Sequence, residues 1–129
     1  MHPGPALPRI TDAIAAAALF AELRGAPVEQ AAVALLDPEW RLLGTIAFSG
    51  EQRSVAPSLR AIVRAALLHD AAALILAHNH PSGCAEPSSA DLAFTRALVR
   101  IAAPLELALV DHLILTPDAT TSFRAIGLL

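Results

Sequence analysis

Two histidines, His78 and His80, stand two residues apart directly after an apolar run that predicts a buried strand. In an extended chain, residues two apart face the same side, so the two imidazoles can converge on one metal ion. Asp91 opens the next predicted helix and is the candidate for a third ligand. Two histidines and one carboxylate leave a fourth tetrahedral position for water, which is the arrangement of a catalytic zinc site.

Hydrolysis at such a site needs two further groups, a general base for the attacking water and a donor for the oxyanion of the intermediate. Ser88 lies three residues before Asp91 and can point into the same space. Glu29 stands where the first predicted strand starts, and an apolar stretch follows it, so it belongs at an end of the sheet. We therefore take Glu29 as the candidate base. The sequence does not show whether Glu29 and the two histidines lie at the same end of the sheet.

The same residues also have structural interpretations. Either histidine alone is most simply a strand-end histidine, and only the full spacing favours metal binding. Ser88 and Asp91 fit a capping box at the start of an apolar helix. Because one carboxylate cannot easily serve fully as both cap and ligand, we favour the ligand, which the histidines need as a third partner. Glu29 has an alternative as a solvated charge, and Asp111 with His112 forms either a structural pair or a support behind the metal ligands.

Strands and helices alternate along a chain that has the length of one domain. Residues 1–8, with three prolines and a glycine, predict a loose arm, and the polar residues 49–56 predict a loop. The fold class is therefore α/β or α+β, with an N-terminal arm and helix at 1–27 and the main domain at 28–129. Helices are expected at 11–24, 57–69 and 88–103, and strands at 28–36, 41–48, 72–77 and 105–115, the last interrupted by a polar pair.

The composition excludes several chemistries. The 129 residues include nine arginines but no lysine and no tyrosine, so a Schiff-base lysine, a P-loop lysine and a tyrosine nucleophile are impossible. The single cysteine, Cys84, cannot form an internal disulfide or a cysteine-rich zinc cluster, and we interpret it as a tolerated small residue. The net charge of −3 and the scattered arginines give nucleic-acid binding no support, although they do not exclude it.

The longest apolar run, residues 13–21, has nine residues, too few to span a bilayer. An aspartate directly precedes it, so it makes a poor signal peptide, and we interpret it as a buried helix face. With a single free cysteine as well, we expect a cytoplasmic protein without membrane association.

At the residues with chemical potential, the chain resembles a known family. Glu29 is followed far downstream by His78-x-His80, then after seven residues by Ser88, and after two more by Asp91. This order and spacing resemble the JAMM (JAB/MPN-type) metalloprotease signature. The fuller string HNHPSG…PS..D, with a threonine at position 95 and a later Asp-His pair, resembles the bacterial RadC branch, and the resemblance extends over about residues 28–129.

The resemblance implies a single JAB/MPN-type domain with a mixed central sheet flanked by helices, related in architecture to cytidine deaminases. It implies that Zn²⁺ is held by His78, His80 and Asp91. Glu29 would activate the zinc-bound water, and Ser88 would help to stabilise the oxyanion. In the wider family this machinery hydrolyses peptide or isopeptide amides.

The chain departs from the family pattern at three places. RadC-type proteins usually carry an N-terminal helix-hairpin-helix region of the DNA-binding type, whereas residues 1–27 have room for one helix, so we expect a domain without that region. The family's Pro-Arg-Glu is Pro57-Ser58-Leu59 here, which puts a role of the Arg-Glu pair in doubt. Cys84 replaces the usual acidic residue beside the motif.

Three functional hypotheses follow. The leading one is a zinc-dependent metallohydrolase of the JAMM type that acts on a protein or peptide substrate. The alternative is a RadC-like accessory or binding module in DNA repair or mobile-element biology, with a structural or idle metal site. A scaffold subunit like the inactive MPN domains is disfavoured, because scaffold members typically lack the ligands that are intact here. The sequence gives neither the substrate nor the oligomeric state, and a homo-oligomer is compatible with it.

Overall fold

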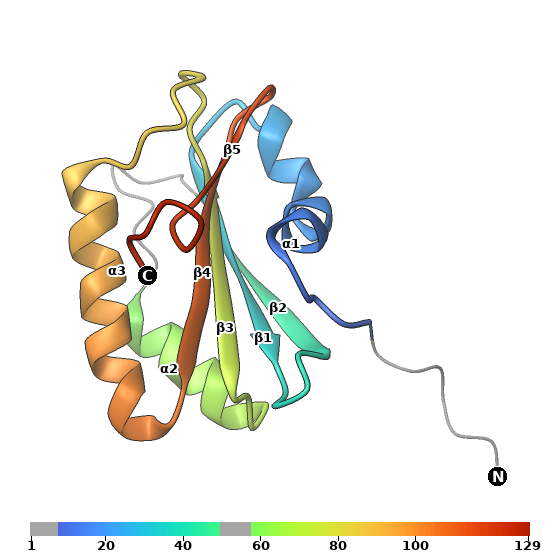
Figure 1. Cartoon of the computed structure of the whole chain (residues 1–129), viewed down its shortest axis with the longest axis vertical. Coiled ribbons are helices and arrows are strands. Elements are labelled where there is room, and N and C mark those ends of the chain that lie inside the picture. Colours follow the sequence, from blue (N-terminus) through green and yellow to red (C-terminus); the bar gives the residue numbers. More distant parts are fainter. Residues whose placement is uncertain (1–7, 50–57) are drawn as a thin grey trace, which may run out of the picture.

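In the part of the chain that the structure describes, the strands form one sheet of five (Figure 1). The computed structural model describes residues 8–49 and 58–129. The strands are β1 (Gln30–Leu36), β2 (Leu42–Ser49), β3 (Ala73–Asn79), β4 (Ala108–Leu115) and β5 (Thr120–Ser122). Their order in the sheet is β2-β1-β3-β4-β5. Strands β3 and β4 are parallel and the other neighbouring pairs are antiparallel, so the sheet is mixed.

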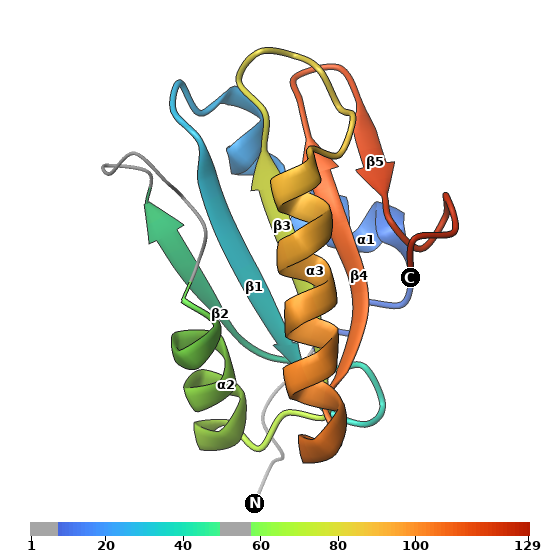
Figure 2. The same cartoon turned by 90° about the vertical axis from the view of Figure 1, so that its left-hand side faces the viewer.

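Helices cover both faces of this sheet (Figures 1 and 2). Helix α1 (Ala13–Leu19) lies on one face, and helices α2 (Leu59–Leu68) and α3 (Ser89–Ala102) lie on the other. Two hydrophobic cores result, one around Phe20 on the α1 side and one around Leu98 on the α2–α3 side. The predicted class, a single mixed α/β domain with a central sheet flanked by helices, is confirmed.

Strand β3 lies in the middle of the sheet, and all seven of its residues are buried. Its side chains alternate between the two cores, as successive residues of a strand must. Ile75 and Ala77 pack on the α1 side, whereas Leu74 and Leu76 pack on the α2–α3 side. The continuous apolar run therefore correctly predicts a strand covered on both faces. The strand extends two residues beyond the predicted end at residue 77, so His78 lies inside it.

The first helix is shorter than predicted. Helix α1 begins after Asp12, whose Oδ1 accepts a hydrogen bond from the Ala15 N–H at 2.7 Å, and it ends before Phe20. The chain continues as a 3-10 helix, η1 (Ala21–Gly25), where the sequence predicts an α-helix up to residue 24. Phe20 and Leu23 are three residues apart and both are buried, which suits the three-residue period of a 3-10 helix.

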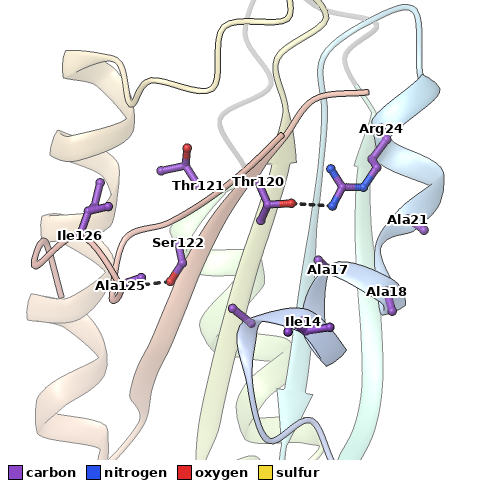
Figure 3. A pocket seen from close by; sticks show the side chains of 11 residues that line it. Ile14, Ala17, Ala18, Ala21, Arg24, Thr120, Thr121, Ser122, Ala125 and Ile126 are labelled. Carbon is purple, nitrogen blue, oxygen red and sulfur yellow. Dashed lines mark hydrogen bonds between the residues drawn. The ribbon is translucent and has the colours of Figure 1, made fainter. Parts of the chain in front are cut away.

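Arg24 fastens this helical layer to the turn between β4 and β5. Its Nη1 donates to the carbonyl oxygens of Thr116 and Ala119, both at 2.8 Å, and its Nη2 donates to Thr120 Oγ1 at 2.5 Å. Figure 3 shows Arg24 and Thr120 at a pocket of about 520 Å³ between α1 and β5, which Ile14 also lines. None of the five candidate site residues from the sequence lines this pocket.

The C-terminal part departs from the prediction at two places. A 3-10 turn, η2 (Ala103–Leu105), and the left-handed Glu106 at φ +58° separate α3 from β4, so the strand begins three residues later than the predicted start at residue 105. Asp111 and His112 lie buried within β4 and do not interrupt it. The sequence does not predict strand β5, because three residues carry too little periodicity to be recognised.

Helix α2 begins after Ser58, whose Oγ accepts a hydrogen bond from the Ala61 N–H at 3.2 Å. The arm expected at residues 1–8, the loop expected at 49–56 and the expected helix start at Pro57 fall almost wholly outside the described residues. Within residues 8–49 and 58–129, no helix is both long and apolar enough to cross a membrane.

Candidate metal centre

The pairing of β1 with β3 brings Glu29 to the two histidines. The strands are antiparallel, and Ala31 on β1 lies opposite His78 on β3. Continuing the same register by two residues places Glu29 beside His80, on the same face of the sheet. The sequence could not show that Glu29 lies at the same sheet end as the histidines, and the structure places it there.

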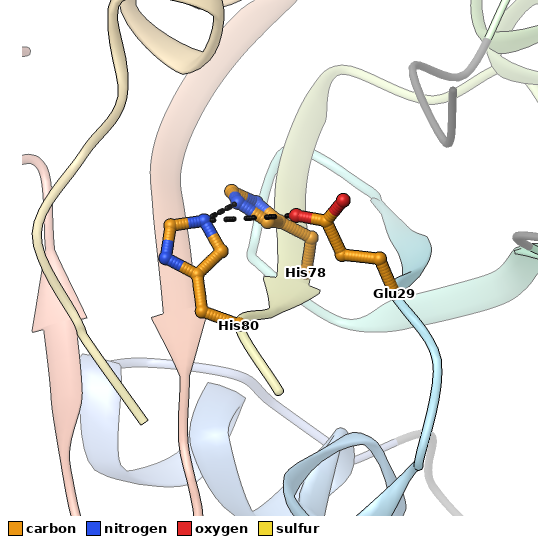
Figure 4. A group of neighbouring side chains, drawn as sticks. All are labelled: Glu29, His78 and His80. Atoms are coloured by element: carbon orange, nitrogen blue, oxygen red, sulfur yellow. Dashed lines mark hydrogen bonds and ion pairs between the residues drawn. The ribbon is translucent and has the colours of Figure 1, made fainter. Parts of the chain in front are cut away.

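The two histidine side chains meet at their Nε2 atoms, which are 2.9 Å apart (Figure 4). Asp91, in the first turn of α3, places Oδ1 3.2 Å from His78 Nε2 and Oδ2 3.2 Å from His80 Nε2. Glu29 Oε1 lies 3.8 Å from His80 Nε2. The possible ligand atoms of Glu29, His78 and His80 all lie within 4.8 Å of one another, so these residues form a potential metal-binding group.

Exposure increases across the site from one side to the other. The side chain of His78 is 7% exposed, those of His80 and Asp91 are 13% and 16% exposed, and that of Glu29 is 45% exposed. The two imidazoles and the Asp91 carboxylate therefore form a largely buried floor, and Glu29 stands at the solvent side.

Ser88 and Asp91 form the capping box that the sequence suggested. The Ser88 N–H donates to Asp91 Oδ2 at 2.8 Å, and the Asp91 N–H donates to Ser88 Oγ at 3.0 Å. The Asp91 carboxylate thus caps the helix and also faces both histidines, and its role as a metal ligand stays a prediction. An ionised carboxylate has about four lone-pair directions, so one oxygen can accept from the helix terminus while both face the imidazoles. Ser88 Oγ is an acceptor in the cap, and its hydroxyl hydrogen stays available for another partner.

A relay of hydrogen bonds behind His78 determines which ring nitrogen of His78 carries the proton. The Thr95 hydroxyl donates to the Asp91 carbonyl oxygen at 2.9 Å. Thr95 Oγ1 therefore accepts from His112 Nδ1, 2.6 Å away, and His112 Nε2 is left to accept from His78 Nδ1 at 2.7 Å. A His78 ring that holds a single proton therefore carries it on Nδ1 and directs the lone pair of Nε2 into the site.

His80 is fixed in the same sense by the loop that follows it. Its Nδ1 lies 2.8 Å from the carbonyl oxygen of Cys84, and a carbonyl can only accept, so Nδ1 carries the proton. The loop closes with the Gly83 N–H donating to the His80 carbonyl at 3.0 Å, and Gly83 has a φ of +87°, which glycine adopts without strain. When each ring holds a single proton, the Nε2 lone pairs of the two histidines thus point at each other and at Asp91.

The neighbouring residues Asp111 and His112 turn out to have separate surroundings. Asp111 accepts hydrogen bonds from the Ser122 hydroxyl at 2.5 Å, from the Arg124 N–H at 3.1 Å and from the His112 N–H at 2.8 Å. Asp111 therefore joins β4 to the end of β5 and to the segment after it, whereas the His112 ring lies behind His78. The sequence does not decide between a structural role and a supporting role for Asp111 and His112, and it assigns no role to Thr95. The signal for Thr95 is its position four residues after Asp91, the spacing at which a helical threonine reaches a preceding carbonyl.

Burial and charge shift two pKa values at this centre. Burial, together with the positive charge that His78 carries when it is protonated, lowers the pKa of His112 to about 3, so His112 stays neutral near pH 7. Burial by itself raises the pKa of Asp91, but the hydrogen bond and positive charge of His78 when that ring is doubly protonated, together with hydrogen bonds from Ser88, outweigh it and hold that pKa well below its usual range. Asp91 is therefore an anion that faces the two imidazoles.

Known proteins are similar to this chain over most of its length. The family model described as the RadC-like JAB domain matches residues 10–128, a range that includes α1. The chain is 44% identical over 110 residues to a UPF0758 protein of Alcanivorax borkumensis, which covers 84% of this chain and 49% of that protein. It is 45% identical over 114 residues to a UPF0758 protein of Bordetella petrii, covering 83% and 48% of the two chains. The chain thus spans about half the length of the curated relatives it matches.

Proposed function

The chain belongs to the RadC-like JAB domain family, and on that premise we propose that it is a zinc-dependent metallohydrolase that cleaves a peptide or isopeptide amide bond. The relatives' name, UPF0758 protein, states no reaction and no metal. The proposal therefore rests on the chemistry of the side chains at the ends of β1 and β3 and at the start of α3.

The observation that carries the proposal is the convergence of two imidazole lone pairs and one carboxylate. Facing Nε2 lone pairs 2.9 Å apart repel each other unless a proton or a metal ion lies between them. Two neutral imidazoles and a carboxylate suit zinc. Donor atoms that share one tetrahedral zinc ion at about 2.0–2.2 Å lie about 3.3–3.6 Å apart, and the separations here, 2.9 and 3.2 Å, are shorter than this by a few tenths of an ångström, so small side-chain shifts would admit the ion. The residues present therefore fit the metal that the family resemblance implies.

His78, His80 and Asp91 would hold the ion, with His112 and Thr95 keeping the His78 lone pair directed at it. A zinc ion held there would supply Lewis acidity, which would make the attacking water easier to deprotonate. Glu29, on the solvent side of the site, takes a proton from the attacking water and delivers it to the leaving amine. The free hydroxyl hydrogen of Ser88 is the donor that stabilises the oxyanion.

Metal analysis of the purified chain tests the proposal. We expect about one zinc ion per chain, its loss in His80→Ala, and its retention in His69→Ala, a control at the end of α2 where His69 Nδ1 contacts the Ala65 carbonyl. Glu29→Gln is expected to keep the metal and lose amide hydrolysis. The proposal fails if protein prepared without chelators binds no zinc, even after zinc is added.

A second candidate is a binding module of the RadC type whose metal site is structural. The capping box favours it, because Ser88 and Asp91 also stabilise the start of α3. A salt-dependent DNA titration distinguishes this candidate, since binding that weakens steeply with salt reports phosphate contacts. Negligible binding at low salt would count against DNA association and leave a protein or peptide as the proposed partner.

A further inference from the structure

Asn79, which stands between the two candidate metal ligands, uses all of its side-chain hydrogen-bonding groups on the opposite face of the sheet. It is the only asparagine in the chain and is 1% exposed. Its Oδ1 accepts a hydrogen bond from the Gln30 N–H at 2.6 Å. Its Nδ2 donates to the carbonyl oxygens of Val28 at 3.0 Å and of Ala26 at 3.3 Å.

These three partners lie on both sides of Glu29. Residues 26–29 connect η1 to β1 and belong to neither element. Among the described residues, the backbone at 27–29 makes no hydrogen bond to other backbone groups. The Asn79 amide is therefore the contact that ties this segment to β3, immediately before and immediately after Glu29.

The strand geometry links this contact to the site. Adjacent residues of a strand point to opposite faces, so Asn79 faces the α1 side while His78 and His80 face α3. The end of β3 thus presents the histidines on one face of the sheet. On the other face, Asn79 forms hydrogen bonds to the segment that carries Glu29. A shift of that segment relative to β3 would move the Glu29 carboxylate away from His80 Nε2, which now lies 3.8 Å from it.

We propose that Asn79 is a positioning residue, which holds the Glu29 carboxylate beside the His78–His80 centre by binding the backbone on both sides of Glu29. The inference rests on the proposed metal site and on the role of Glu29 in it. A purely structural role would make Asn79 important for stability alone, whereas a positioning role makes any effect of Glu29 depend on Asn79.

A double-mutant cycle read out by zinc affinity separates these two roles without any substrate. The four chains are the wild type, Glu29→Gln, Asn79→Ala and the double variant, each titrated with zinc against a chromophoric chelator. Removing the Glu29 charge from beside the ion should weaken zinc binding about three- to tenfold in the wild type. In the Asn79→Ala background the same change should weaken it less than about twofold, because the carboxylate is no longer held there.

Ser122→Ala is the matched control, because Ser122 is also a buried polar residue that joins β5 to a neighbouring element on the α1 side. In that background Glu29→Gln should weaken zinc binding by the wild-type factor. If Asn79→Ala does not fold, as judged by circular dichroism, Asn79→Ser is carried through the same cycle.

Three results would overturn the inference. One is an equal effect of Glu29→Gln with and without Asn79, and another is the absence of any effect in the wild type. The third is a control background that loses the effect as well, which would indicate general loosening of the fold. Failure of the wild type to bind zinc would instead overturn the proposed metal site itself, so the two failures are distinguishable.

Discussion

The relay from Thr95 through His112 to His78 predicts that a residue without any contact to the metal controls its affinity. Thr95→Val keeps the branched shape of a buried side chain but removes Oγ1, which accepts from His112 Nδ1 at 2.6 Å. His112 can then move its proton to Nε2. In that state His78 Nδ1 becomes the acceptor, and the His78 proton moves to Nε2, where it faces Asp91 and occupies the site of the metal.

The size of the effect follows from the groups left without partners. Zinc binding to the variant requires His78 to release that proton and His112 to carry its own on Nδ1, which then points at a methyl group. An unsatisfied donor in a buried position costs about 1–3 kcal/mol, and His112 is 1% exposed. Loss of a supporting hydrogen bond of this kind typically weakens metal binding by about 10–100-fold. We therefore expect zinc affinity to fall within that range.

Chelator competition at pH 7.5 measures this affinity, and urea unfolding with and without zinc measures the accompanying stability. Thr95→Ser is the matched control, because it keeps the hydroxyl and loses only the methyl group. The control should bind zinc within about threefold of the wild type, since the relay remains intact. If Thr95→Val binds zinc as tightly as Thr95→Ser, the relay does not set the tautomer of His78 and the reasoning is refuted.

Two further predictions concern stability. The pKa of His112 is about 3 in the folded chain, against an ordinary value of 6.5. Below pH 6.5 the unfolded chain therefore binds a proton at His112 that the folded chain does not bind. The free energy of unfolding of the zinc-free protein should consequently fall by about 2 kcal/mol between pH 8 and pH 5. Urea titrations check this, and a slope that persists unchanged in His112→Leu would contradict it. Arg24→Ala removes three hydrogen bonds to the β4–β5 turn and should lower the free energy of unfolding by about 1–3 kcal/mol. The control Arg96→Ala, at an exposed position on α3, should lower it by less than about 0.5 kcal/mol. Equal urea midpoints for the two variants would count against the effect expected of Arg24→Ala.

The parts of the site that depend on local spacing could be predicted from the sequence. The two-residue period of a strand brings His78 and His80 to one face, and the helix start after the short loop brings Asp91 to them. The same local logic correctly predicts the buried central strand and the limits of α3. The catalytic and ligand roles of these side chains stay predictions, which the metal analysis tests.

The parts that depend on strand pairing could not be predicted in this way. Glu29 reaches His80 only because Ala31 lies opposite His78, and the pattern of apolar residues in β1 does not encode which residue of β3 it faces. His112 lies behind His78 through the parallel pairing of β3 with β4, which places Leu76 opposite His112. The register of a strand pair depends on two segments that are distant in the sequence. A local motif therefore identifies the candidate metal ligands but not the residues that strand pairing brings next to them.

The layer formed by α1 and η1 also helps to hold the candidate metal centre in place. Arg24 holds the turn between β4 and β5, and Thr121, on β5, donates to the Ala85 carbonyl at 2.6 Å in the loop that also orients His80. Asn79 holds the segment after η1, which carries Glu29. Elements on the face of the sheet opposite α3 thus constrain both loops that border the candidate metal centre. Because the pocket beside Arg24 lies in this same layer, a change that loosens α1 should disturb Glu29 and His80 together.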